Sequence, residues 1–212
     1  MAINREHAFG IGTLLPAPET ATWSRLTEPL QERAQELWRL FRKRTVISDH
    51  ALLGPSAWVE NLTRTPDRIS ILSHSVVRGL IRAEAKGKIS IGSYSYIGDD
   101  VLISSHMEVR IGNDVLIAHG CQIFDNASHP LEWQDRAQHF RDILSGKADK
   151  WDIKTAPVVI GNNVWVGLNS IIIAGVTIGD RSVVAAGSVV TRAVPADVMV
   201  AGNPAREIRR LP

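Results

Sequence analysis

The 212-residue chain lacks most features of secreted and membrane proteins. A single cysteine, Cys121, excludes an internal disulfide framework. No stretch approaches the roughly 18 uncharged apolar residues that span a bilayer. The N-terminus has no basic region followed by an apolar one, as a secretory signal has. We therefore expect a protein of the reducing cytoplasm.

Excess charge is also absent, since the formal net charge is only +2. No basic stripe interleaved with stacking aromatics is present, so the sequence does not predict nucleic-acid binding. The arginines instead gather near the C-terminus, at Arg192, Arg206, Arg209 and Arg210. This cluster suits a polyanionic small molecule or a solvated basic tail.

Residues 1–45 form a segment distinct from the rest, and we predict a helix over about 28–44. Thr27 is a candidate N-cap, Pro29 lies in the first turn, and basic residues close the last turn. An apolar stripe recurs at three- and four-residue steps, at Leu26, Leu30, Ala34, Leu37, Trp38 and Phe41. This face packs against the same protein or a neighbouring subunit, or alternatively lies on a membrane surface.

A six-residue repeat dominates the chain from about residue 46 onward. Small residues often follow its aliphatic positions, and small or β-branched residues stand four positions after them, except at Met107. The clearest aliphatic positions are Ile91, Ile97, Ile103, Ile111, Ile117, Ile123, Ile160, Val166, Ile172, Ile178, Val184 and Val190. This period fits neither an α-helix nor one long strand, and a fixed repeat predicts a solenoid.

We therefore predict an all-β fold, a triangular coil of short parallel strands. The aliphatic residue and the residue four later point into a narrow interior, and stacked coils bury one another's inner faces. Cys121 occupies an inward position, so we interpret it as a core residue and not a nucleophile.

The repeat is interrupted by an excursion over 129–157, and excursions from a solenoid often carry function. Just before it the chain has the letters DNASHP, which include Asn126 and His129. Histidine titrates near neutrality and suits removal of a proton from a hydroxyl group.

The coil resumes with IGNNVWVGLNS and later AGSVVTRAVPADVMVAGNPAREIR. Together with the DNASHP stretch, these motifs resemble the hexapeptide-repeat acyltransferases, and most closely the sugar O-acetyltransferases of the galactoside and maltose type. The resemblance implies a left-handed parallel β-helix, acetyl-CoA as acyl donor, no metal, and a homotrimer with sites between subunits. The domains would be a helical segment 1–45, the β-helix 46–203 with its excursion, and a basic tail 204–212.

The resemblance also implies the roles of individual residues. His129 would be the general base, and the backbone N–H of Leu168 would donate to the oxyanion. Asp100, Asn126 and Trp133 would contact the saccharide acceptor. The residues expected near acetyl-CoA are Trp165, Gly167, Ala186, Gly187, Thr191, Arg192, Arg206 and Arg209, of which Gly167, Ala186 and Gly187 leave room for the pantetheine arm and the arginines contact phosphate.

Several alternatives stay open from the sequence. Trp133, Phe140 and Trp151 either stack on a sugar or anchor the excursion to an adjacent subunit. The acceptor is a saccharide used in surface polysaccharide, or a drug of the streptogramin or chloramphenicol class, and a non-catalytic scaffold is a third possibility. His106, His119 and His129 invite comparison with zinc-dependent γ-type carbonic anhydrases, although the ten positions between His119 and His129 are too many for that family's spacing.

Overall fold

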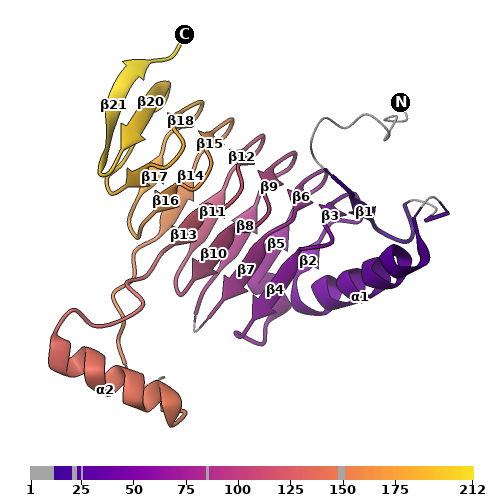
Figure 1. Cartoon of the computed structure of the whole chain (residues 1–212), viewed down its shortest axis with the longest axis horizontal. Helices are drawn as coiled ribbons and strands as arrows, with labels where there is room; N and C mark the ends of the chain where they lie inside the picture. Colours follow the sequence, from indigo (N-terminus) through magenta and orange to yellow (C-terminus); the bar gives the residue numbers. More distant parts are fainter. Residues whose placement is uncertain (1–11, 21–22, 25, 85, 148–150) are drawn as a thin grey trace.

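Three β-sheets form the three sides of a parallel coil in this computed structural model, which describes residues 12–20, 23–24, 26–84, 86–147 and 151–212. The successive coils stack along one long axis (Figure 1). Each coil contributes one short strand to each sheet, because the chain turns a corner after roughly every six residues. The repeat predicted from the sequence is therefore the repeat of the coil.

We call the nine-stranded sheet A and the two six-stranded sheets B and C. Sheet A contains β1 (Leu15–Pro16), β3 (Leu52–Leu53), β6 (Val76–Val77), β9 (Tyr96–Ile97), β12 (Leu116–Ile117), β15 (Trp165–Val166), β18 (Val183–Val184), β20 (Val198–Gly202) and β21 (Ala205–Arg210). Sheet B contains β2 (Val46–Ile47), β5 (Ile69–Ile71), β8 (Ile89–Ile91), β11 (Val109–Ile111), β14 (Val158–Ile160) and β17 (Thr177–Ile178). Sheet C contains β4 (Trp58–Asn61), β7 (Leu80–Ala83), β10 (Leu102–Ser105), β13 (Gln122–Phe124), β16 (Ile171–Ile172) and β19 (Val189–Val190).

The interior of the coil is filled by the predicted aliphatic positions. In sheet A, for example, Ile97 pairs with Ile117 and Ile117 with Val166, and all three side chains are fully buried. Cys121 is also fully buried, with its thiol directed at the Gly167 carbonyl oxygen, which confirms it as a core residue. Each coil thus buries its inner face against its neighbours.

The outer faces of the three sheets differ in polarity. The outward side chains of sheet A are Leu52, Val76, Tyr96, Leu116, Trp165, Val183 and Met199, and we call this row the A stripe. Those of sheet C include Trp58, Leu80, Leu102, Gln122, Ile171 and Val189, which we call the C stripe, and also the charged pair Glu60 and Arg82 beside it. Sheet B instead presents Ser70, Ser90, Arg110 and Thr177 among its outward residues. The A stripe and the C stripe are therefore largely apolar rows, and the outer face of sheet B is more polar.

Helix α1 (Glu28–Arg44) covers the N-terminal end of the coil, as the sequence predicted (Figure 1). Its apolar stripe buries Ala34, Leu37, Trp38 and Phe41 against the first coil. The Trp38 indole N–H donates to the Leu15 carbonyl at 3.0 Å. The helix closes an otherwise open core, and this leaves its apolar face unavailable to a membrane. The helix begins after the expected N-cap, although the Thr27 hydroxyl makes no capping bond. Residues 1–11, 21–22 and 25 of the predicted 1–45 segment lie outside the described residues.

Two parts of the chain have more secondary structure than the sequence indicated. The expected basic tail, 204–212, contains β21, which pairs antiparallel with β20 at the C-terminal end of sheet A. The excursion contains α2 (Trp133–Leu144), which projects away from the coil in Figure 1. A short 3₁₀ helix, η2 (Pro66–Arg68), precedes β5. Among the described residues no helix has the length and apolar character required to cross a membrane.

Candidate active site

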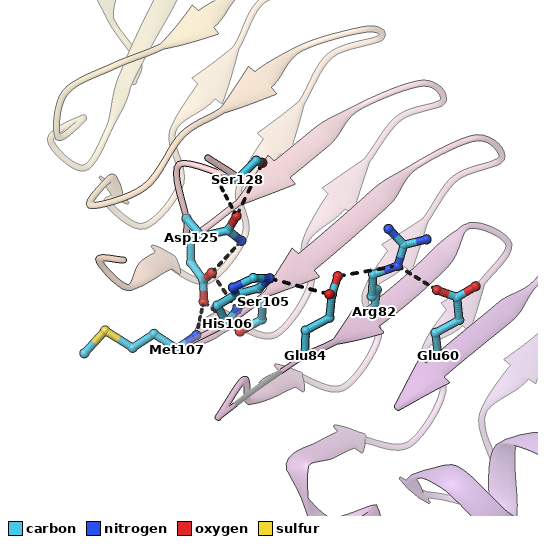
Figure 2. A network of polar contacts seen from close by, with 9 residues as sticks. Glu60, Arg82, Glu84, Ser105, His106, Met107, Asp125 and Ser128 are labelled. Carbon is cyan, nitrogen blue, oxygen red and sulfur yellow. Dashed lines mark hydrogen bonds and ion pairs between the residues drawn. The ribbon is translucent and has the colours of Figure 1, made fainter. Parts of the chain in front are cut away.

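A buried aspartate fixes the point where the chain leaves the coil. Asp125 follows β13 and is fully buried. Its carboxylate accepts hydrogen bonds from the Ser105 hydroxyl at 2.7 Å and from the backbone N–H groups of His106 and Met107 at 2.8 Å (Figure 2). Three donors satisfy the buried charge. The excursion therefore starts from a rigid position one coil above Ser105.

Asn126 belongs to the same framework. Its side-chain N–H donates to Asp125 at 3.2 Å, and its carbonyl oxygen accepts the Ser128 N–H at 3.0 Å. Only 8% of the residue is exposed. Both ends of its amide therefore hold the start of the excursion, and its contact with substrate stays a prediction.

A row of charged side chains continues from this point along the edge between sheets C and B. Arg82 contacts Glu60 at 2.6 Å and Glu84 at 3.8 Å, and Glu84 lies 3.7 Å from His106 Nε2 (Figure 2). The neighbouring His106 ring is the largest influence on Glu84 and lowers the pKa of its carboxyl. This row was not predicted from the sequence; its signal is that Glu60 and Arg82, and again Glu84 and His106, are separated by about one coil, while Arg82 and Glu84 stand two positions apart.

The predicted base, His129, lies exposed at the start of the excursion. Its Nδ1 is 3.0 Å from Nδ1 of His139 on α2. The guanidinium of Arg136, also on α2, donates to the Leu131 carbonyl at 2.7 Å. Helix α2 therefore holds both the imidazole ring and the backbone that follows it. His139 was missed in the sequence because the helix that carries it was not predicted.

The inner side of α2 forms a small cluster of its own. His139 is 5% exposed and Asp142 is 4% exposed. The Trp151 indole N–H donates to Asp142 at 2.8 Å, and its ring lies 5.6 Å from that of His139. Burial lowers the pKa of His139, the nearby His129 lowers it further, and Asp142 opposes both. Residues 148–150 of the excursion lie outside the described residues.

The predicted oxyanion donor has a backbone N–H that is free to bind a ligand. Leu168 lies in the turn between β15 and β16, followed by Asn169 with φ +54°. Within the described part of the chain, the Leu168 N–H donates to no acceptor, whereas the Gly167 N–H donates to Val184. An N–H left open at a corner suits a developing negative charge.

The predicted residues are divided between two edges of the prism. Asp100, Gly167, Leu168, Ala186 and Gly187 follow strands of sheet A and lie where it meets sheet C. His129 follows β13 and emerges at the opposite edge of sheet C. The four residues of β10 alone span about 13 Å at the rise of an extended strand. One protomer therefore does not bring the predicted base together with the predicted oxyanion donor.

The residues expected near acetyl-CoA differ in how much free space surrounds them. A Cβ at Gly167 would lie 2.6 Å from the Ala186 backbone nitrogen, so stacking of the coils itself requires glycine there. Gly187, by contrast, has open space around it and φ +68°. Trp165 projects outward in the A stripe and is 53% exposed. Asp100 is exposed at a corner with φ +56°, as a turn residue would be.

The C-terminal arginines partly converge. Arg192 and Arg206 line a common cavity of about 180 Å³ beside Val200 and Glu207. Thr191 directly follows β19, next to this cavity, and Arg209 lies on β21 opposite Met199. Two guanidinium groups and the Glu207 carboxylate therefore meet at one cavity.

The three histidines considered for zinc lie in different surroundings. His106 contacts Glu84, His119 accepts the Asp99 N–H at 3.0 Å, and His129 contacts His139. Among the residues that the structure describes, no group of three or more His, Cys, Asp or Glu side chains is placed to hold a metal ion.

Comparison with known proteins matches the chain to acyltransferases with the same hexapeptide repeat. Residues 157–192 match the family model described as hexapeptide repeat of succinyl-transferase. The chain is 37% identical over 123 residues to the galactoside O-acetyltransferase of Escherichia coli, covering 58% of this chain and 54% of that one. It is 33% identical over 134 residues to the putative colanic acid biosynthesis acetyltransferase of Escherichia coli, covering 63% and 65%. The chain thus spans between half and two thirds of these relatives.

One similar solved structure aligns with a larger share of this chain than these two relatives do. A hexapeptide-repeat-containing acetyltransferase of Vibrio cholerae, complexed with acetyl-CoA, is 30% identical, with a TM-score of 0.56 over 84% of this chain and 78% of that one. This likeness confirms the left-handed parallel β-helix predicted from the sequence. The fold, the repeat and these matches together show that the chain belongs to the hexapeptide-repeat acyltransferase family.

Proposed function

We propose that the protein is an acetyl-CoA-dependent O-acetyltransferase that modifies a saccharide hydroxyl, in the cytoplasm, for surface polysaccharide. The observation that carries this proposal is His129, an exposed histidine held by its Nδ1 at the start of the excursion. Similarity to proteins named as galactoside and colanic acid acetyltransferases supports the saccharide acceptor.

The proposed reaction is direct transfer in a ternary complex. His129 Nε2 takes the hydroxyl proton as the oxygen attacks the acetyl carbonyl carbon. The Leu168 N–H stabilises the negative charge on the carbonyl oxygen of the tetrahedral intermediate. The C–S bond then breaks, and the CoA thiolate receives the proton from His129. The proposed route passes through no acyl-enzyme, and the one cysteine of the chain is buried in the core, away from acetyl-CoA.

Acetyl-CoA is proposed to lie along the C-terminal coils. Arg192 and Arg206, which share a cavity, suit its phosphates. The open space at Gly187 suits the pantetheine arm. The acetyl-CoA complex of the Vibrio cholerae acetyltransferase supports a donor of this kind.

The complete site is proposed to form between two copies in a homotrimer. The base and the oxyanion donor lie at different edges of one protomer, so a second copy has to supply one of them. The A and C stripes are two different apolar faces, and pairing one with the other is a heterologous contact that closes by a threefold rotation. Leu116 and Trp165, half exposed in the protomer, would be covered in this contact.

The outer face of α2 is proposed to meet the acceptor or the adjacent subunit. Trp133, Phe140 and Leu144 fall on one side of the helix and are 67%, 56% and 73% exposed. Such a face is rarely left in solvent. Trp133 is the member nearest to His129 in the chain and the one we assign to sugar stacking.

Thiol release from acetyl-CoA tests this function across saccharides, nucleotide sugars and antibiotics, with wild type beside His129→Ala. We expect a saccharide-dependent rate that falls by roughly 10²- to 10⁴-fold in the variant. Acetylation of antibiotics alone would assign the protein to the drug-modifying branch. No turnover of any acceptor, together with no binding of CoA, would favour a scaffold.

A further inference from the structure

We propose that His139 is a positioning residue that accepts the Nδ1–H of His129 and so keeps the Nε2 lone pair of His129 free to act as the base. The inference rests on the proposed function and concerns a residue outside the motif that pointed to His129. It starts from one contact, the 3.0 Å between the two Nδ1 atoms.

A contact between two ring nitrogens at this distance requires one proton between them. If His139 were the donor, the His129 Nδ1 would be the acceptor, and neutral His129 would carry its proton on Nε2. That tautomer has no lone pair to accept a proton from a hydroxyl. If His129 is the donor, Nε2 on the opposite side of its ring is the free base.

The surroundings of the two rings favour the second arrangement. His139 is 5% exposed, lies on the inner side of α2, and meets His129 edge-on at 67° and Trp151 at 5.6 Å. Burial of so enclosed a ring opposes its charging. His129 is exposed. Asp142 is the carboxylate that faces His139 from its own helix, and His129 is the titratable group that faces it from the adjoining segment.

During transfer the pair would work as a unit. His129 Nε2 takes the hydroxyl proton and becomes an imidazolium whose Nδ1–H still donates to His139. His139 stays neutral throughout, and the proton passes from His129 Nε2 to the leaving thiolate. The role is that of the third group in a catalytic triad, which orients the base and stabilises its charged form.

Two substitutions at position 139 separate positioning from simple packing. In His139→Asn the amide oxygen can occupy the place of Nδ1 and keep the acceptor, but the ring is lost. In His139→Phe the ring is kept and the acceptor is lost. Positioning predicts that kcat falls by about 10²-fold, the low end for loss of a general base, in His139→Phe, with KM for acetyl-CoA unchanged. The same reasoning predicts that His139→Asn retains most activity.

A packing role predicts the reverse order, with His139→Phe close to wild type and His139→Asn impaired, and this order would overturn the proposal. Nitrogen NMR of labelled histidine gives a second readout that does not depend on turnover. We expect neutral His129 to carry its proton on Nδ1 in wild type and to lose this preference in His139→Phe. An Nε2–H tautomer in wild type would also overturn it. Failure of the proposed function itself would be distinguished by a wild type that acetylates no acceptor.

Discussion

The turn at Leu168 offers a substitution that removes a single hydrogen-bond donor. Asn169 has φ +54° and Leu168 does not share this positive φ, which makes Leu168 the i+1 residue of a type II turn. Proline is favoured at that position. The Leu168 N–H also has no acceptor within the described chain, so Leu168→Pro breaks no internal hydrogen bond. The fold should therefore tolerate the change.

The expected loss of activity follows from the proposed role of this N–H. Removing one oxyanion donor costs about 10²- to 10³-fold in kcat, or roughly 3 to 4 kcal/mol of transition-state stabilisation. We expect this loss in Leu168→Pro, with a melting temperature close to that of wild type. Leu168→Ala is the matched control, because it keeps the N–H and removes only a side chain that is 47% exposed.

The assay is thiol release from acetyl-CoA at saturating acceptor, with thermal unfolding measured on the same preparations. A Leu168→Pro variant that melts normally and keeps wild-type kcat would refute the assignment of this N–H to the oxyanion. Equal losses in the proline and alanine variants would assign the effect to the side chain instead.

Other substitutions test packing and assembly. Leu116→Arg places a charge in the A stripe, so we expect monomers by light scattering and loss of activity; an active trimer would contradict the proposed interface. Trp38→Ala empties a site that is 1% exposed and should cost about 3 to 5 kcal/mol in denaturant unfolding; a change below about 1 kcal/mol would contradict the capping role of α1. Gly167→Ala places a Cβ 2.6 Å from the Ala186 nitrogen and should lower the melting temperature. An unchanged melting temperature would contradict the need for glycine at this position. The pKa of His139 in the folded protein is lowered below its ordinary 6.5. The neutral His139 ring therefore makes its full contribution to the stability of the excursion above about pH 6.5, and this contribution is lost as the pH falls through the pKa of the folded state. The protection factors of the α2 amides, which compare the measured exchange with the intrinsic exchange at each pH, should therefore fall on acidification in wild type but much less in His139→Phe, and equal behaviour would contradict this.

The coil and its covering helix could be predicted because their signals are local and repeated. Aliphatic residues such as Ile97 and Ile117 recur at the same step over many coils, and each lands in the core. The helix over 28–44 has an apolar stripe and a basic last turn, and the structure begins and ends it at those residues. Regular periodicity of this kind can be recognised in the sequence without knowledge of the tertiary contacts.

The structure of the excursion and the arrangement of the site were harder to predict from the sequence. The excursion was expected as a loop, because Trp133 and Phe140 were interpreted as isolated aromatics; their seven-residue separation was the helical signal. The contact between His129 and His139 depends on that helix folding back. The division of His129 and Leu168 between two edges is a property of the coil in three dimensions, which motifs aligned along the chain do not reveal.

The central claim, a site shared between copies with His129 from one and the Leu168 N–H from another, is tested most directly by mixing two inactive variants. His129→Ala and Leu168→Pro chains, unfolded together and reassembled at equal amounts, should give trimers in which about one site in four has both groups intact. We predict recovery of about a quarter of the wild-type rate, while each variant alone stays inactive. A mixture no more active than its parents, despite proven mixed trimers, would contradict the shared site.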